Sequence, residues 1–417
     1  MKMTYADDRR KLTEALAQFS DTNRSMGTAS MREEDEARVK ALMLKWAPYL
    51  GERVEVDGQK YELWPVPTRM WPLMSLMFEN QVIANPAPRS LYEATTKSVV
   101  SLPAEYSLPL IREIFPSLIM NSICSVQPMP IQSGGVMNVY WLKFYRESDS
   151  PEVQVTTADS DYAYRTEGQV PKKMRLKLTS TSVTATKDIL NAEWTTEVEE
   201  DARGTLGLDV PSEMLQAMGQ EILRELEQRV ISQMESDATG GNTTWHYTMG
   251  STYTTAKEWY ETIFHAVIDS DKLIRDNYRR GANFIIAGNT ALTYFMKANS
   301  FGIAEAMGPT FEGPLPSGVK FEGRISNQWD LYSSDYVTTT KAIVSRYPEG
   351  MLHAGYIWAP YIPLMPMPRQ YASSADYDDA TLPGALTNTD SWNQNIRTRN
   401  GRYMCAPDMF TTITIAS

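Results

Sequence analysis

The strongest helical pattern in the chain lies between residues 211 and 235. Apolar residues recur there every three or four positions, and charged residues fill most positions between them, which is typical of a helix with one buried face. Pro211 suits the first turn of this helix, because a backbone N–H at that position would have no partner within the helix. At about 1.5 Å per residue the predicted helix is roughly 37 Å long. We expect it to lie across a sheet or another helix.

Two segments with strand patterns flank a polar stretch and predict a long hairpin over residues 134–178. Residues 136–145 are rich in β-branched and aromatic side chains and follow a Gly-Gly turn, whereas residues 172–184 alternate apolar with polar side chains. The apolar members of this alternation are Met174, Leu176 and Leu178. A lone hairpin is only marginally stable in water, so we expect this one to lie on another surface.

The second half of the chain alternates helical and strand patterns. Helical spacing covers residues 256–274 and 289–298, and strand patterns cover residues 282–287, 323–330 and 336–347. This alternation predicts a mixed α/β domain. Residues 356–368 are aromatic and rich in proline, and proline cannot donate to a sheet ladder, so this segment is predicted to lie at a sheet edge rather than in its centre.

Three patterns precede the hairpin. Residues 37–50 have the apolar spacing of a helix, and residues 107–126 have it too, with an interruption at Pro116. Residues 63–89 combine frequent prolines with large apolar side chains. Because proline interrupts regular elements and apolar side chains need cover, the pattern predicts an extended arm that packs on this chain or on a neighbour.

Composition narrows the class of protein. The 417 residues carry a net charge of −11, which argues against a protein that mainly grips nucleic acid phosphates. No apolar run approaches the ~18 residues of a membrane-spanning helix, and residues 1–25 lack the apolar core of a signal peptide. The two cysteines fit a reducing compartment. We therefore expect a soluble, intracellular protein that is not associated with a membrane.

Sequence motifs for catalysis are absent: there is no phosphate-binding glycine loop, no dinucleotide fingerprint, no zinc-protease motif and no nucleophile elbow. Glu193, Glu197 and Asp201 are four residues apart and would share one face of a helix. Such carboxylates could act in acid–base chemistry or hold a hard cation, which leaves a soluble α/β hydrolase as one hypothesis. A solvated helix face is the favoured interpretation. The sequence thus predicts no enzyme, no catalytic residue, no cofactor and no metal site.

Five segments in a fixed order resemble the major capsid proteins of large contractile-tailed, T4-like bacteriophages. The first two are residues 111–129, with a central Phe-Pro and a final Val-Gln-Pro-Met, and residues 189–226, with Asn-Ala-Glu-Trp and Leu-Gly-Leu-Asp. The next two are residues 283–287 (Asn-Phe-Ile-Ile-Ala) and residues 359–364 (Ala-Pro-Tyr-Ile-Pro-Leu). The last is residues 397–401 (Arg-Thr-Arg-Asn-Gly), which resemble a basic turn. Each segment is short, but together they extend over residues 111–401. The first ~100 residues carry no comparable match.

The resemblance implies an α+β chain with the Hong Kong 97-type capsid fold. Its parts would be an N-terminal arm (1–100), a segment leading into the P-domain (101–133), the E-loop hairpin (134–178), the P-domain with its long spine helix (179–245), the A-domain (246–368), and a return to the P-domain (369–417). In this family the E-loop lies over a neighbouring subunit. The predicted hairpin and the predicted long helix both agree with this order.

The resemblance also implies the function of a major capsid protein. Such a protein assembles with itself into hexamers and pentamers, which form the shell around the phage genome. It would meet portal and scaffold proteins, and decoration or vertex proteins, and would enclose double-stranded DNA without sequence-specific binding, first in the host cytoplasm and then in the virion. A vertex-only minor paralogue with the same fold remains an alternative.

Overall fold

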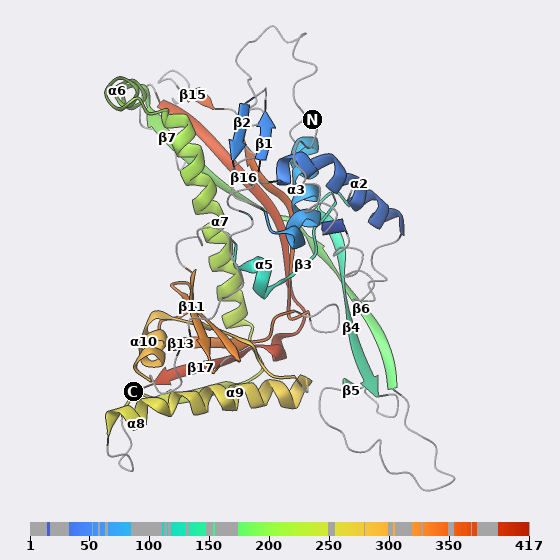
Figure 1. Cartoon of the computed structure of the whole chain (residues 1–417), viewed down its shortest axis with the longest axis vertical. Coiled ribbons are helices and arrows are strands. Elements are labelled where there is room, and N and C mark those ends of the chain that lie inside the picture. The colour runs from blue at the N-terminus through green and yellow to red at the C-terminus, as the bar shows by residue number, and fades with distance from the viewer. Residues whose placement is uncertain are drawn as a thin grey trace, which may run out of the picture.

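The computed structural model describes residues 15–16, 33–51, 53–56, 59–62, 66–84, 111, 115, 118–130, 133–146, 153–154, 174–248, 255–278, 280–298, 303–304, 319–326, 328–348, 354–367, 369–372 and 391–416. These residues form a mixed helix and sheet structure, so the α+β class is confirmed (Figure 1). Among them, no helix has the length and apolar character needed to cross a membrane.

Helix α7 (Val210–Ser236) confirms the predicted long helix and runs along one side of the body (Figure 1). Its buried stripe includes Leu215, Ile222, Leu226 and Val230. This stripe packs on strands β7 (Thr186–Thr195) and β16 (Ser391–Met404). Helix α6 (Thr196–Leu206) precedes α7 and ends at Gly207, whose φ of 67° is the left-handed conformation that glycine adopts without strain.

The sheet beneath α7 is built from strands that are distant in sequence. Strand β16 pairs with β7, with β14 (Tyr356–Pro366) and with β15 (Gln370–Ala372), and β14 also pairs with the two-residue strand β3 (Ser125–Val126). The predicted edge position of residues 356–368 is therefore wrong, since β14 lies between β16 and β3 and is almost wholly buried.

The prolines of β14 are tolerated for two local reasons. The register against β16 shifts between Pro360 and Ile362 and again between Ile362 and Met365, which is the irregularity expected where a residue cannot donate to the ladder. On the opposite side, β3 pairs only with Ile357 and Trp358, so no ladder hydrogen bond is required from the prolines there. Proline content alone therefore did not reveal that this strand is central.

A second, seven-stranded sheet confirms the mixed α/β pattern of the second half. Its strand order is β10 (Ile303–Ala304), β11 (Val319–Ile325), β12 (Trp329–Ser334), β9 (Phe284–Ala287), β13 (Lys341–Ser345), β17 (Thr411–Ala416) and β8 (Asn242–His246). Helices α8 (Ala256–Glu261), α9 (Ile263–Tyr278) and α10 (Asn289–Lys297) accompany it, and α9 packs on β8, β13 and β17 (Figure 1). The predicted strand over residues 323–330 is wrong, because the chain turns at Ser326, with a φ of 52°, and Asp330 lies within β12.

The N-terminal region is more helical than predicted. It holds α2 (Glu33–Leu50), a small hairpin of β1 (Arg53–Val56) and β2 (Gln59–Glu62), a 3₁₀ turn η1 (Thr68–Met70), and α3 (Trp71–Ala84). Helix α3 occupies most of the segment predicted to be an extended arm. Pro72 lies in its first turn, where proline costs no helix hydrogen bond. Helix α3 packs against α2 and β14, so this part of the segment packs on its own chain.

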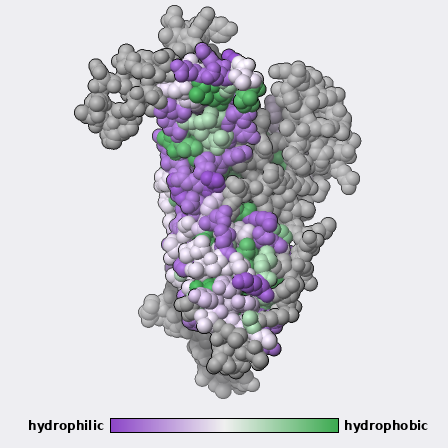
Figure 2. Space-filling model, turned by 90° about the vertical axis from the view of Figure 1, so that its left-hand side faces the viewer, coloured by the Kyte–Doolittle hydropathy of each residue, from purple (hydrophilic) through white to green (hydrophobic). Residues whose placement is uncertain are grey.

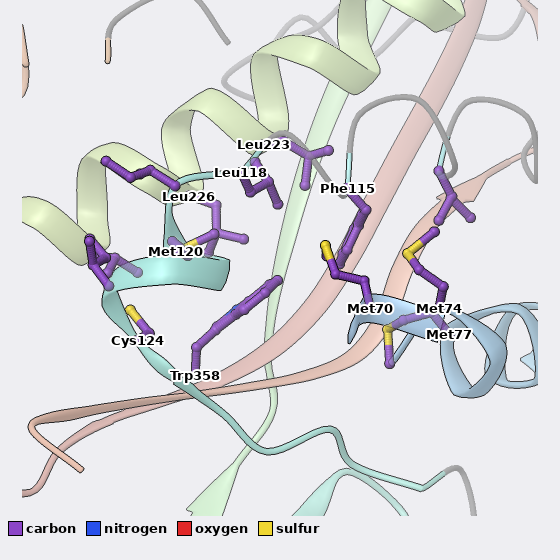
Figure 3. Packing of buried hydrophobic residues seen from close by; sticks show 14 of the residues in the cluster. Met70, Met74, Met77, Phe115, Leu118, Met120, Cys124, Leu223, Leu226 and Trp358 are labelled. Atoms are coloured by element: carbon purple, nitrogen blue, oxygen red, sulfur yellow. The ribbon is translucent and has the colours of Figure 1, made fainter. Parts of the chain in front are cut away.

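The largest hydrophobic core joins these N-terminal helices to α7. In Figure 3 the fully buried Trp358 of β14 lies between methionines of η1 and α3 on one side and leucines of α7 on the other. Its ring stacks on Phe115 at a centroid distance of 5.7 Å. Helix α5 (Met120–Ile123) contributes Met120 and Ile123 to this core and lies within the predicted helical segment 107–126, much of which lies outside the described residues.

Strands β4 (Val136–Arg146) and β6 (Met174–Thr184) confirm the predicted hairpin, which extends six residues beyond its predicted end at residue 178. Their ladder is continuous from the pair Val136 and Thr184 to the pair Arg146 and Met174. A short strand β5 (Val153–Gln154) adds to the far end of β4. In Figure 1 the hairpin projects away from the body.

Candidate assembly interface

The three carboxylates that suggested acid–base chemistry are not brought together on one helix face. Glu193 lies on strand β7, because that segment pairs with β16, whereas Glu197 and Asp201 lie on α6. The helix begins only after Thr195, whose hydroxyl accepts a hydrogen bond from the Val198 N–H. All three carboxylates are exposed. Over the described ranges, no group of three or more His, Cys, Asp or Glu side chains could hold a metal ion.

The projecting hairpin leaves apolar side chains uncovered. Leu176 and Leu178 of β6 are 57% and 55% exposed, and their neighbours Arg175 and Lys177 are exposed as well. Since successive side chains of a strand point to opposite faces, both faces of this part of β6 are open to solvent. The predicted alternation of apolar and polar residues is present, but Leu176 and Leu178 are not buried against the part of the chain that the structure describes. A second surface is needed to cover them.

The base of the hairpin is built differently. Val139 of β4, Val183 of β6 and the following Ala185 are buried. They belong to a separate small core with Met129 and with residues of β14 such as Ala359. The hairpin is thus anchored where it leaves the body and uncovered further along β6, which is the arrangement of an arm that reaches another molecule.

A second group of exposed apolar side chains lies at the end of the molecule that carries α6. It consists of Ile189 on β7, Val198 and Leu206 on α6, and Leu208 in the following turn. Figure 2 shows this side of the molecule, where apolar patches lie among hydrophilic surface toward the upper end. Isolated exposed apolar residues are ordinary, but Val198, Leu206 and Leu208 follow one another along α6 and the turn after it, so this helix is a candidate contact surface.

The opposite end of the molecule carries an aromatic cluster between β8, α8 and α10. Trp245 stacks with Trp259 at 6.1 Å, and Tyr247 stacks with Tyr294 at 6.0 Å. Lys297 lies 5.0 Å from the centroid of the Tyr294 ring, within the range of a cation–π contact. Tyr247 is 45% exposed. Aromatic residues are enriched at protein interfaces, so this end is a third candidate contact surface.

One ionisable group is buried inside the body. Glu227 of α7 has no exposed surface and accepts a hydrogen bond from the Ile119 N–H at 2.8 Å. Burial raises the pKa of this carboxyl to about 8, because the charged form loses its hydration. Burial and the nearby Glu227 together raise the pKa of the Cys124 thiol. The hydrogen bond from the Ile119 N–H to this neutral carboxyl therefore connects the segment before α5 with the long helix α7.

The sequence pattern indicated the hairpin but none of these exposed groups as functional residues. The only available signal for Leu176 and Leu178 was their alternation with charged residues, which does not say which molecule covers them. The aromatic group is assembled from β8, α8 and α10, which are separate segments of the chain, whereas the apolar group comes from β7, α6 and the turn after α6.

Comparisons with known proteins agree with the resemblance seen in the sequence. A family model described as major capsid protein Gp23 matches residues 143–376. A major capsid protein of Vibrio phage KVP40 is 22% identical to this chain, over 47% of this chain and 41% of that protein. The matched region thus spans less than half the length of that curated relative.

Solved structures of phage proteins are similar to this chain at low sequence identity. A chain from the capsid of cyanophage P-SCSP1u has a TM-score of 0.42 and 12% identity, over 72% of this chain and 88% of that chain. A chain from Mycobacterium phage Adephagia has a TM-score of 0.41 and 11% identity, over 72% and 90%. A chain from the capsid of Myoviridae phage XM1 has a TM-score of 0.39 and 8% identity, over 68% and 86%.

Proposed function

Because the chain belongs to the Gp23 family of major capsid proteins, we propose that it builds the shell of a tailed bacteriophage. The subunit associates with itself into hexamers and pentamers, and these close into a shell around double-stranded DNA. The observation that carries the proposal is the family match over more than half of the chain, residues 143–376. The uncovered hairpin is the feature of this subunit that fits such a role.

The parts of the subunit follow the Hong Kong 97-type plan. The hairpin of β4 and β6 is the E-loop, and α7 is the spine helix of the P-domain. The seven-stranded sheet with α8, α9 and α10 is the A-domain. Two strands depart from the domain bounds expected from the sequence. Strand β14 was expected in the A-domain, but it pairs with β16, which supports assigning it to the P-domain; strand β17 was expected in the P-domain, but it pairs with β13 and β8, which supports assigning it to the A-domain.

The shell is stabilised by contacts between subunits that recur at every equivalent interface. Complete burial of a leucine side chain contributes about 1.5–3 kcal/mol. Leu176 and Leu178 are little more than half exposed, so covering both on a neighbour contributes roughly 2 kcal/mol per hairpin. Such a contact is weak alone, but symmetry repeats it at every equivalent interface of a shell.

The role is structural, and we assign no catalytic residue, cofactor or metal to it. Portal and scaffold proteins are the proposed partners during assembly in the host cytoplasm, and decoration or vertex proteins are proposed partners in the virion. The net charge of −11 supports weak binding to the enclosed DNA without sequence specificity, because an inner wall that bound DNA tightly would hinder packaging and release.

Electron microscopy of the purified chain tests the proposal. We expect negatively stained shells, tubes or six-fold capsomers at moderate salt, either from the chain alone or from the chain co-expressed with a scaffold protein of its phage. Monomers of about 47 kDa under both conditions would contradict the proposal.

Deletion of residues 148–170 tests the hairpin separately. The expected product has the circular dichroism spectrum of the folded subunit and forms no shells. Shells of normal size from this deletion would contradict the E-loop assignment while leaving the family assignment intact.

A further inference from the structure

The hairpin is joined to the body at two points that lie side by side. On one strand, Gly134 and Gly135 precede β4 with φ values of 66° and 83°. On the other strand, Ala185 connects β6 to β7. The Ala185 N–H donates to the Gly135 carbonyl at 2.7 Å, so the two points are closed against each other. Both Gly135 and Ala185 are buried. Because they connect the hairpin to the body, a change in hairpin direction requires a change of backbone conformation at these residues.

Arg399 of β16 reaches this root from the body. A Cβ atom placed on Gly135 would lie 2.7 Å from Arg399 Nη2, so the guanidinium packs directly against the glycine. The same Nη2 donates to the Ala185 carbonyl over 3.5 Å. The guanidinium carbon lies 5.0 Å from the centroid of the Tyr361 ring on β14. One side chain therefore touches both root points and the sheet behind them.

The neighbours of Arg399 hold the same region. Thr186 Oγ1 donates to the Asn400 carbonyl at 3.1 Å, and a Cβ atom on Gly401 would lie 2.7 Å from a methyl carbon of Val183. The predicted basic turn at residues 397–401 is wrong, because these residues lie in the middle of β16, held in the ladder by β7 and β14. Instead of turning the chain, the motif attaches the base of the hairpin to the body.

We propose that Arg399 is a positioning residue that sets the direction in which the β4–β6 hairpin leaves the body. This inference rests on the proposed function, since the direction of the hairpin matters only where the hairpin must meet a neighbouring subunit. A strand rises about 3.3 Å per residue, so Lys177 lies roughly 26 Å from Ala185 along β6. A rotation of about 10° at the root therefore displaces Lys177 by roughly 5 Å, which is enough to misplace Leu176 and Leu178 on a partner surface.

The two glycines provide a matched pair of variants. Both have positive φ, so alanine introduces comparable backbone strain at either position. A Cβ at Gly134 meets nothing within 4 Å, whereas a Cβ at Gly135 displaces the flexible end of Arg399. The difference between Gly134→Ala and Gly135→Ala thus isolates the contact with Arg399 from the strain.

Pulsed electron spin resonance on the isolated full-length subunit measures the hairpin direction. Spin labels on Lys177→Cys and on Gln228→Cys, an exposed position of α7, report the distance between hairpin and body, and the two native cysteines are buried. We expect the same narrow distribution for the otherwise unchanged labelled subunit and for Gly134→Ala. For Gly135→Ala and Arg399→Ala we expect a shift of about 5 Å or a corresponding broadening, with circular dichroism of a folded subunit. Arg399→Lys, which keeps the charge but lacks the planar fork, should show a smaller change.

Unchanged distributions in Gly135→Ala and Arg399→Lys would overturn the proposal even if Arg399→Ala failed to fold. The double variant Gly135→Ala with Arg399→Ala adds a further check, because it should shift no more than either single variant. The distance is measured without assembly, so it separates the two claims. Shells from every variant with unchanged distances would refute the role of Arg399 alone, whereas an unchanged chain that never assembles would refute the proposed function alone.

Discussion

The buried carboxyl of Glu227 makes the stability of the subunit depend on pH in an unusual direction. Its hydrogen bond from the Ile119 N–H is compatible with a neutral carboxyl, and among the described residues Cys124 and Tyr336 are titratable groups that interact with it. Among the described residues no lysine or arginine forms an ion pair with it. Replacing Glu227 by glutamine keeps a hydrogen-bond acceptor for Ile119 and removes the ability to become charged.

The magnitude follows from the difference between the folded and unfolded pKa values. The pKa is about 8 in the folded chain, against an ordinary value of 4.5. Between these values the folded state binds one proton more than the unfolded state, so the free energy of unfolding falls by about 1.4 kcal/mol for each pH unit gained. Over the whole interval the loss is on the order of 5 kcal/mol. The stabilisation is complete below the unfolded pKa and is lost by the time the pH passes the folded one.

Denaturant unfolding of the unassembled subunit at pH 5, 6, 7 and 8 measures this effect. The original chain and Glu227→Gln should differ little at pH 5. The variant should then become progressively more stable than the original chain, by several kcal/mol at pH 8. Each comparison is made at one pH, so the titration of the other carboxylates cancels.

Equal free energies of unfolding for the two chains at every pH would contradict a raised pKa of Glu227 in the folded subunit. Glu225→Gln is the matched control, since it removes an exposed carboxylate from the same helix. We expect its difference from the original chain to stay within about 0.5 kcal/mol across the range.

Three further changes test other parts of the structure. Serine at both Leu176 and Leu178 should leave the melting temperature of the subunit nearly unchanged and reduce the yield of shells in sedimentation, because these side chains are exposed until assembly. Glu235→Gln should lower the free energy of unfolding by about 1 kcal/mol at pH 7, because it weakens the ion pair with Lys341. The loss should be smaller at pH 3, because the hydrogen bonds from Thr338 and the charge of Lys341 lower the pKa of Glu235, and the stabilisation by the carboxylate disappears as the pH falls through that pKa. Trp358→Ala should lower the free energy of unfolding by about 3–5 kcal/mol in chemical denaturation, because it empties the centre of the main core.

The elements that the sequence predicted well are those whose pattern is local. Helix α7 and the β4–β6 hairpin each show their period within one uninterrupted segment, and the hairpin needs only neighbouring strands to pair. The prediction of an extended arm over residues 63–89 was wrong because it counted prolines without considering their position. Pro72 lies in the first turn of α3, where proline is compatible with a helix.

Errors about the site came from pairing between distant segments. Glu193 was assigned to a helix, but β7 pairs with β16 about two hundred residues later, and the helix starts only after that strand ends. The same long-range pairing turned the motif around Arg399 from a turn into the middle of a strand, where it meets the root of the hairpin. No local pattern carries that information, because the contact depends on how two distant segments align.

A cryo-electron microscopy reconstruction of shells assembled from the chain tests the proposed role of the hairpin most directly. We expect the hairpin of β4 and β6 to cross onto an adjacent subunit, where Leu176 and Leu178 are covered. A reconstruction in which the hairpin stays in solvent or folds back onto its own subunit would contradict that role.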